Sequence, residues 1–321
     1  MTRGMQAGRQ TTLREHVSVA GIGVHSGSPA TVTLHPAEAD TGIVFLRCET
    51  SGRKDREIPA IFRSVTATEF ATVLGDKNGP AVSTTEHVLA ALSALSIDNA
   101  IVEVDGPEIP IMDGSAGAFV DAIDQAGIVT LSASRRCIKV LKPVRVGADG
   151  CSAELRPYAR GLRIETEIEF NHPLIGRQAF AFDVEPVLFR RELARARTFG
   201  FMRDVTKLWS AGYALGASFE NTVVVAEDRI LNSEGLRFAD EFVRHKAVDA
   251  IGDLALAGAP LIGAYRSVRG GHKLNHAVIT ALMSDPTAWT YAEIEEPVRR
   301  ARGHADLATG HMVPVYGPDV S

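Results

Sequence analysis

Three side chains suited to metal or proton chemistry recur at one-turn intervals within residues 241–253. His245 and Asp249 stand four positions apart, and Asp253 follows after four more. The apolar residues around them recur at spacings of one, three and four without proline, which predicts an amphipathic helix. Side chains four apart project from one stripe of a helix, so an imidazole and a carboxylate in this register can bind one metal ion. A second carboxylate one turn further on can orient another group in the same site.

A Glu-His pair lies near the start of a second predicted helix, at about residues 83–95. Ser83 or Thr84 is expected to cap this helix. Neighbouring helical residues point about 100° apart, so His87 can bind a metal while Glu86 reaches a water molecule beside it. The competing interpretation is that Glu86 only complements the helix dipole and that His87 is a satisfied residue at the helix start.

Together the two helices supply the parts of a catalytic site. His87, His245 and Asp249 would make three ligands with a fourth position open for water, which is the pattern of a catalytic zinc ion. His272 follows two glycines at the start of a last predicted helix. Asp253 is a suitable partner to keep His272 protonated as an acid. The alternative for each helix is a solvated charged face, and for His272 an ordinary loop histidine.

Composition restricts the class of protein. The chain has 321 residues, of which 45% are hydrophobic and 23% charged, with a net charge of −5. These values are typical of a globular protein with room for two domains, and the negative charge argues against a nucleic-acid binder. No apolar run is long enough for a membrane span, and the first 16 residues lack the apolar core of a secretory signal. Three scattered cysteines fit a reducing cytoplasm. Because they are scattered, they do not form a metal-binding motif, and any metal would have nitrogen and oxygen ligands.

The predicted elements follow a similar order in the two halves of the chain. In each half, strands precede a helix that carries a histidine, and a strand, a glycine-rich loop and a second helix follow. This order predicts an α+β fold of two domains, each a sheet covered by a helix pair. The helices would pack between the two sheets, with the active site at the domain interface. We place the domains at 1–132 and 133–300 and a tail at 301–321, and interpret residues 130–136 as a polar connector.

Six motifs of this chain occur together in one known family of enzymes. In chain order they are Thr84-Thr-Glu-His87, Glu108-Ile-Pro-Ile-Met-Asp-Gly-Ser115, Arg197-Thr-Phe-Gly-Phe-Met-Arg-Asp204, Leu236-Arg-Phe-Ala-Asp-Glu-Phe-Val-Arg-His-Lys246, Asp249-Ala-Ile-Gly-Asp253 and Gly271-His272. They resemble the motifs of the zinc-dependent UDP-3-O-acyl-N-acetylglucosamine deacetylases of lipid A biosynthesis. The resemblance runs from about Thr11 to about Met283. The first ten residues and the tail after Asp285 match nothing, and we assign them no role.

The resemblance implies a reaction and a set of roles. The enzyme would remove the N-acetyl group from UDP-3-O-[(3R)-3-hydroxyacyl]-N-acetylglucosamine and release acetate, the committed step of lipid A biosynthesis. One zinc ion per chain would be held by His87, His245 and Asp249. Glu86 would act as the general base on the zinc-bound water, and the Thr198 hydroxyl matches the family's second partner for the oxyanion.

Two candidates exist for the proton that the leaving amine needs. His272, held by Asp253, matches the group that protonates or electrostatically assists this amine. Glu86 could instead perform both proton transfers. Lys246 cannot share the direction of His245 and is better placed for substrate anions such as the diphosphate.

An acyl channel is implied in a β-α-β insert of the second domain, at about residues 195–226. The matching positions are Phe199, Phe201, Met202, Val205, Phe219, Thr222 and Val224. The same side chains could equally form the small core that such an insert needs. His25 lies in a glycine-rich segment, Gly21–Gly27, that lacks the spacing of a phosphate or dinucleotide loop and is predicted to be a hairpin turn. It matches a family histidine close to the site.

Two other classes of function remain open on the sequence. One is a zinc hydrolase of a different N-acyl substrate. The other is a protein that binds acyl-sugar nucleotides without catalysis, although such a protein would not need a full set of ligands, base and acid. We expect a cytoplasmic monomer that binds an acylated UDP-sugar, with no nucleic acid and no transmembrane segment. The sequence does not distinguish iron from zinc.

Overall fold

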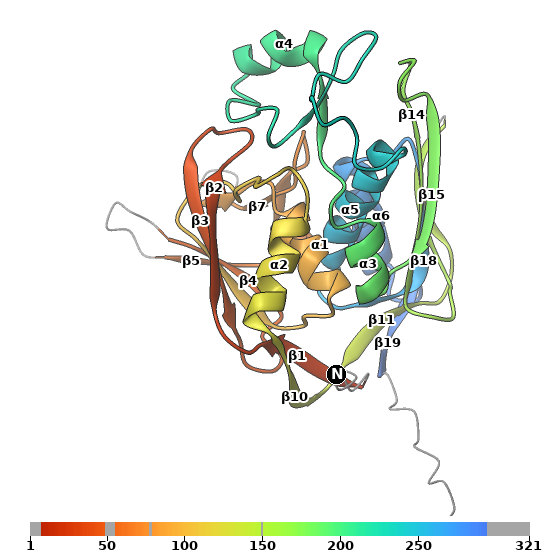
Figure 1. Ribbon diagram of the computed structural model, residues 1–321. Helices are drawn as coiled ribbons and strands as arrows, with labels where there is room; N and C mark the ends of the chain where they lie inside the picture. Colours follow the sequence, from red (N-terminus) through yellow and green to blue (C-terminus); the bar gives the residue numbers. More distant parts are fainter. Residues whose placement is uncertain (1–7, 49–54, 77–78, 149, 294–321) are drawn as a thin grey trace, which may run out of the picture.

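The structure is a computed structural model, and it describes residues 8–48, 55–76, 79–148 and 150–293. Its helices lie between two groups of strands, as Figure 1 shows, with α4 at one end of the molecule. This is the predicted α+β architecture. The predicted tail at 301–321 lies outside the described residues.

The N-terminal half contains one main sheet and two smaller ones. Its elements are β1 (Arg9–Leu13), β2 (Val17–Ile22), β3 (Pro29–Pro36), β4 (Ile43–Arg47), β5 (Arg56–Pro59), η1 (Phe62–Ser64), β6 (Val65–Ala67), β7 (Val73–Gly75), β8 (Ala81–Val82), α1 (Glu86–Ala94), β9 (Ala100–Val104), α2 (Gly117–Ala126) and β10 (Ile128–Ser134). In the described residues the main sheet has the order β2-β3-β9-β4-β5. Alternate residues of β3 and β9, such as Val32 and Val102, are buried, because successive strand side chains point to opposite faces.

The C-terminal half is organised around one central strand. Its elements are β11 (Arg136–Val140), β12 (Val144–Ala148), β13 (Cys151–Arg156), β14 (Leu162–Glu169), β15 (Arg177–Asp183), α3 (Pro186–Glu192), β16 (Phe199–Phe201), η2 (Met202–Asp204), α4 (Val205–Ser210), β17 (Val223–Val225), α5 (Glu241–Ala255), β18 (Leu261–Val268), α6 (His272–Ser284) and β19 (Trp289–Glu293). Strand β18 pairs with β11 and β14 in parallel and with β13 antiparallel. Strands β16 and β17 pair in parallel, and α4 lies between them in the chain.

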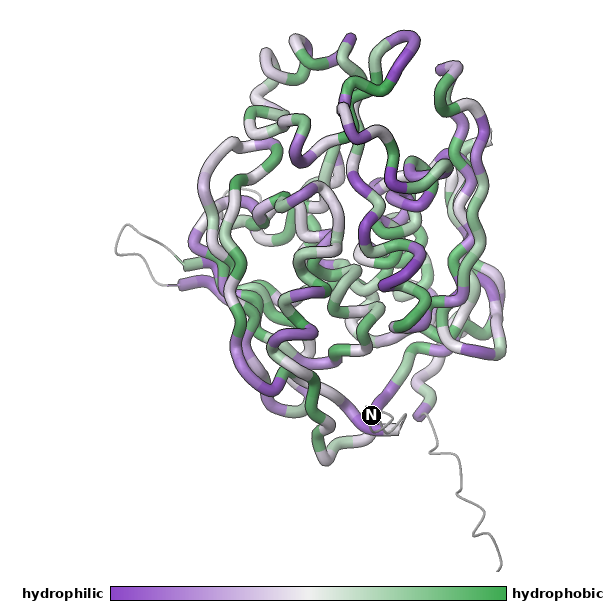
Figure 2. Tube along the Cα trace, in the orientation of Figure 1, coloured by the Kyte–Doolittle hydropathy of each residue, from purple (hydrophilic) through white to green (hydrophobic). Residues whose placement is uncertain are grey.

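Helices α1 and α5 form the centre of the layer between the sheets. Helix α1 is buried along its length except at Ser93, and in Figure 2 it is mostly coloured as hydrophobic. The two helices approach most closely at Gly252, where a Cβ atom would stand 1.9 Å from the Glu86 carbonyl oxygen. Only glycine permits this approach, which brings the start of α1 against the C-terminal third of α5.

One continuous cluster of buried apolar side chains joins the two halves. It includes Leu34 of the N-terminal sheet, Leu92 of α1, Leu254 of α5 and Tyr265 of β18. The boundary predicted between residues 132 and 133 falls within β10, and the division into domains stays a prediction.

Two local predictions are wrong. Residues 130–136 are not a connector, because β10 pairs antiparallel with β1 and β11 begins at Arg136. The polar side chains alternate with half-buried ones along β10, a pattern that a two-stranded ribbon tolerates. Neither Ser83 nor Thr84 caps α1: the N-cap position is Thr85, which makes no side-chain capping bond, and the Thr84 hydroxyl donates instead to buried Glu108.

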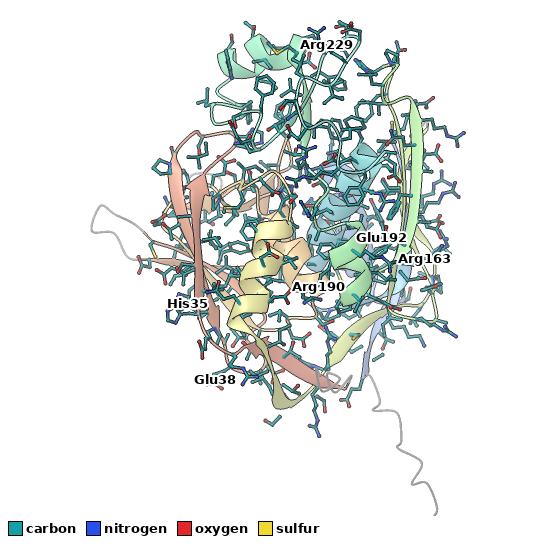
Figure 3. The ribbon with its side chains drawn as sticks, viewed as in Figure 1. His35, Glu38, Arg163, Arg190, Glu192 and Arg229 are labelled. Carbon is teal, nitrogen blue, oxygen red and sulfur yellow. The ribbon has the colours of Figure 1, made fainter. Side chains whose placement is uncertain are left out.

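Charged side chains are concentrated on the perimeter of the molecule. Figure 3 labels His35 and Glu38 beside the N-terminal sheet and Arg229 near α4. Arg190 of α3 donates to both oxygens of Asp124 on α2, which links the two halves at the surface. None of the helices in the described part of the chain is both long and apolar enough to cross a membrane.

Candidate active site

Three potential metal ligands meet where α1 and α5 are closest. His87, His245 and Asp249 are all buried, and one ligand atom of each lies within 4.8 Å of the others. The Asp249 Oδ1 atom is 3.3 Å from His245 Nε2 and 3.6 Å from His87 Nε2. The two imidazole rings are nearly perpendicular, with 5.0 Å between their centres. The structure therefore brings together the predicted triad from two helices, although His87 and His245 are 158 positions apart in the chain.

The backbone fixes the orientation of His245. Its Nδ1 atom lies 3.0 Å from the Ala196 carbonyl oxygen. Because a carbonyl oxygen only accepts, Nδ1 must carry the hydrogen and donate this hydrogen bond. The Nε2 atom then keeps its lone pair on the side of Asp249, as a metal ligand requires. Burial lowers the pKa of His245 to about 3, so the ring is neutral at physiological pH.

Asp249 has two oxygens in different environments. Oδ2 accepts a hydrogen bond of 2.9 Å from Lys246 Nζ. Oδ1 is buried without a hydrogen-bond partner, one of few such side-chain atoms in the described residues. Burial opposes ionisation of Asp249, but the polar surroundings outweigh it and hold the pKa of this carboxyl well below its usual range: the adjoining His245 and His87 rings, and the Lys246 ammonium, which is the cation bonded to it at neutral pH. An ionised oxygen without a partner, beside two imidazoles, is the arrangement that a divalent cation completes. The residues present thus fit a metal ion.

Glu86 lies beside the triad at the start of α1. The side chain is buried, and its Oε2 accepts a hydrogen bond of 3.1 Å from the Thr72 backbone N–H. Its Oε1 faces His272 Nε2 at 3.9 Å. Burial raises the pKa of Glu86, while the nearby His272 and His87 rings counteract this. A glutamate with a raised pKa and one free oxygen has the properties of a general base.

His272 is held close to Glu86, at the start of α6. Its Nδ1 atom is 2.8 Å from Asp253 Oδ2, so Nε2 is left to face the site. Burial alone would lower the pKa of this imidazole, but the Asp253 and Glu86 carboxylates outweigh it and raise the pKa to about 9. His272 is therefore a cation at neutral pH, as the predicted acid must be.

Two residues that the sequence analysis missed complete the surroundings of Asp253. Asn275 Nδ2 donates to Asp253 Oδ2 at 2.7 Å, and the Thr72 hydroxyl donates to Asp253 Oδ1 at 2.5 Å. Asn275 in turn accepts a hydrogen bond from Tyr265. Asn275 lies three residues after His272 on α6, a helical spacing that could have revealed it. Thr72 gave no comparable signal, because it lies in a loop 181 residues away from Asp253.

A buried ion pair holds the segment before β16. The Arg197 side chain is 1% exposed, and its guanidinium binds Glu241, Glu234 and the Gly235 carbonyl. The Arg197 backbone N–H also donates to Glu241. These contacts anchor the backbone on both sides of Arg197, including Ala196, which orients His245. Arg197 belongs to one of the six motifs, but the sequence alone indicates no role for it.

Thr198 follows directly on this anchored segment. Its N–H donates to the Gly114 carbonyl, and its own carbonyl accepts from Val223, both at 2.8 Å. Gly114 has a positive φ of 85°, and a Cβ atom there would lie 2.1 Å from the Asn221 carbonyl oxygen, so the close approach requires glycine. The backbone of Thr198 is thus fixed two residues after Ala196, whose carbonyl orients His245.

His25 contacts the α4 end of the molecule. It lies in the turn between β2 and β3, as predicted, and its N–H donates to Glu108. Its ring packs edge-on against Tyr213 and is tilted against Phe70. Burial lowers the pKa of His25, although Glu108 counteracts the effect.

The residues proposed for the acyl channel separate into two groups. Phe199 and Phe201 pack with Phe170 and Phe242 in a second, smaller apolar cluster, and Val224 and Thr222 lie beside them on β17 or immediately before it. Met202 and Phe219 are more than half exposed, and Val205 is half-buried at the start of α4. The sequence could not separate core from channel residues, and the structure assigns the first group at least partly to the core.

A cavity of about 250 Å³ lies at the other end of the α1–α5 pair, among residues such as Leu92, Asp98, Arg135 and Leu254. None of the residues described above for metal or proton chemistry lines it. Two of its charged groups are already paired with each other, through the 2.8 Å bond from Arg135 to Asp98. The catalytic candidates themselves are closely packed and buried.

Comparisons with known proteins agree with the motifs. The family model described as UDP-3-O-acyl N-acetylglycosamine deacetylase matches residues 10–284. Proteins of Brucella ovis, Brucella canis and Brucella melitensis biotype 2, each named UDP-3-O-acyl-N-acetylglucosamine deacetylase, are 51% identical to this chain over 285 residues. The similar region covers 88% of this chain and 98% of each relative.

Proposed function

Because this chain belongs to the UDP-3-O-acyl N-acetylglycosamine deacetylase family, we propose that it removes the acetyl group from UDP-3-O-[(3R)-3-hydroxyacyl]-N-acetylglucosamine. The products are acetate and the free 2-amine, and the reaction is a step of lipid A biosynthesis. The observation that carries this proposal is the buried group of His87, His245 and Asp249 beside a base and an acid. A binding protein without catalysis would have no use for that combination.

One zinc ion would be held by His87, His245 and Asp249. The partnerless Oδ1 of Asp249 and the lone pair of His245 Nε2 support this assignment. Bound zinc supplies Lewis acidity, which acidifies a water molecule and polarises the amide carbonyl. Lys246 neutralises the other oxygen of Asp249 and keeps that carboxylate ionised.

Glu86 is the proposed general base. The Thr72 N–H occupies its Oε2, which leaves Oε1 to accept a proton from the attacking water. The Thr198 hydroxyl stabilises the negative charge that develops on the carbonyl oxygen. The anchored backbone of Thr198 supports this role, because an oxyanion donor must be held in place before the reaction.

His272 is the proposed acid for the leaving amine. Asp253 holds the Nδ1 proton, so the proton to be delivered is on Nε2. Glu86 Oε1 lies 3.9 Å from that nitrogen, which also permits the alternative in which Glu86 returns the proton itself. The charge of His272 supports the first assignment, because a cation next to the amine lowers the barrier for its departure.

The substrate's other parts engage residues around this centre. Lys246 is partly exposed and borders the triad, which suits it to a substrate anion such as the diphosphate. The acyl chain is proposed to lie along the β16–α4–β17 insert, with exposed Met202 and Phe219 on its path and Phe199, Phe201, Val205, Thr222 and Val224 beneath or beside it. His25 borders this path from the N-terminal half.

We place the reaction in the cytoplasm, and the three cysteines support this because they are unpaired in the described residues. A monomeric state stays a prediction.

An acetate-release assay on the acylated UDP-sugar tests the function. Chelator should abolish release, and added zinc should restore it; ferrous iron is run beside zinc to compare the two metals. The sugar nucleotide without its 3-O-acyl chain is the control, and it should react at least about tenfold more slowly, since binding energy from remote groups assists catalysis. Equal rates would favour a different N-acyl substrate. No release from the acylated substrate with either metal would refute the proposed function.

A further inference from the structure

Thr72 is a buried loop residue that contacts both partners of the proposed proton transfers. It precedes β7 and is 1% exposed. Its N–H donates to Glu86 Oε2 at 3.1 Å, and its hydroxyl donates to Asp253 Oδ1 at 2.5 Å. Its carbonyl accepts hydrogen bonds from the N–H and the hydroxyl of Thr85. All the polar groups of this one residue are therefore engaged around the site.

We propose that Thr72 is a positioning residue for the deacetylation: it fixes the general base and the carboxylate that orients the acid relative to each other. The inference rests on the proposed function, in which Glu86 is the base and His272 the acid. Thr72 itself need not touch the substrate.

The geometry at Asp253 makes the hydroxyl necessary. His272 and Asn275 both bind Oδ2 of this carboxylate, at 2.8 Å and 2.7 Å. Oδ1 is engaged by the Thr72 hydroxyl. Without that hydroxyl, a buried charged oxygen would lose its donor, and the carboxylate would be free to rotate about its Cβ–Cγ bond. Rotation would carry His272 out of alignment, because the imidazole follows the oxygen that holds its Nδ1.

Glu86 is held by the backbone of Thr72 and not by its side chain. The Thr72 N–H holds Oε2, so Oε1 points toward His272 Nε2. Thr85, immediately before Glu86, binds the Thr72 carbonyl, so the loop and the start of α1 are locked together. A substitution that removes the Thr72 hydroxyl keeps this backbone contact and removes the contacts of the hydroxyl to Asp253 Oδ1 and, at 3.3 Å, to His272 Nδ1.

The contacts of Thr72 join the two halves of the molecule. Thr72 and Glu86 belong to the N-terminal half, whereas Asp253 and His272 are on α5 and α6 of the C-terminal half. The base and the acid are thus held at their 3.9 Å separation by one residue between them. A β-branched side chain suits this role, because its restricted χ1 angle keeps the hydroxyl directed at one acceptor.

Substitution of Thr72 by its isostere tests the proposal. Thr72→Val should lower kcat about 10- to 100-fold, the range for a lost hydrogen bond to a charged group, with KM within about twofold and zinc content unchanged. Thr72→Ser retains the donor and should keep kcat within about threefold of wild type. The matched control is Thr12→Val on β1, away from the site. It removes a buried hydroxyl that donates to the Asn99 carbonyl. It should lower the melting temperature without changing kcat.

Several outcomes would overturn the inference. They are a kcat of Thr72→Val within twofold of wild type, an equal loss in Thr72→Ser, or a loss explained by missing zinc. If Thr72→Val does not fold, Thr72→Cys gives the same comparison with a weaker donor. It should show an intermediate loss of kcat, and wild-type kcat would overturn the proposal.

Glu86→Gln is measured beside these variants to separate the two proposals. If Glu86→Gln retains turnover, the proposed base is wrong. An inactive Glu86→Gln beside a fully active Thr72→Val refutes the role of Thr72 alone.

Discussion

Two buried aspartates one turn apart on α5 have opposite surroundings. Asp249 has an oxygen without a hydrogen-bond partner that faces two imidazoles. Asp253 has both oxygens engaged, by Thr72, Asn275 and His272. The same residue type in the same helical register is therefore suited to two different purposes. An oxygen without a hydrogen-bond partner can bind a metal ion. A carboxylate with both oxygens hydrogen-bonded can only orient a neighbouring group and stabilise a positive charge on it.

Removal of the open carboxylate should have the largest effect. Asp249→Ala deletes one of three proposed ligands and leaves the Lys246 ammonium next to the site, where it repels a cation. We expect most of the bound zinc to be lost and turnover to fall to background. Metal analysis after dialysis, together with the acetate assay, measures both. Full zinc occupancy in this variant would show that the two aspartates do not differ as the contacts indicate.

Neutralisation of the saturated carboxylate should have a smaller effect and leave the metal in place. Asp253→Asn keeps the size of the side chain but weakens its hold on His272 and removes its charge. We expect turnover to fall about 10- to 100-fold, the usual effect of a residue that orients a reacting group. The same metal analysis provides the check. A zinc-free Asp253→Asn protein would instead place Asp253 among the ligands.

The smallest effect should be a displacement of the pH profile. The pKa of His272 is raised from 6.5 to about 9, so the charged acid persists below that pH and is lost as the pH rises through it. The alkaline limb of kcat should follow this loss. Burial alone lowers this pKa, so Asp253→Asn should move the limb to lower pH.

Because a bound cation lowers the pKa of a nearby imidazolium, the test is the shift between wild type and Asp253→Asn, measured as kcat from pH 6 to 10. An alkaline limb at the same pH in both proteins would mean that Glu86 carries both protons.

The sequence predicts those parts of the site that depend on helical register. His245, Asp249 and Asp253 repeat every four residues, so a helix alone places them on one stripe. The meeting of this stripe with Glu86 and His87 depends on how α1 and α5 pack. The close contact at Gly252 determines that packing, and no local pattern reveals it.

Residues that hold the catalytic groups were harder to predict. Thr72 and Arg197 act through contacts that are remote in the chain, and a threonine or arginine in a loop has many ordinary explanations. The same applies to β10, whose polar composition concealed its pairing with β1. The layered fold, by contrast, followed from the order of elements and the apolar faces of the helices.

We propose that metal binding and proton transfer belong to different carboxylates, and Glu86→Gln tests this separation most directly. Glu86 adjoins the proposed ligand His87 and faces His272, so its substitution separates the two roles. We predict one zinc ion per chain in this variant and a kcat lower by about 100-fold or more, from the usual size of a proton-transfer contribution. Wild-type turnover, or loss of zinc together with turnover, would contradict the account.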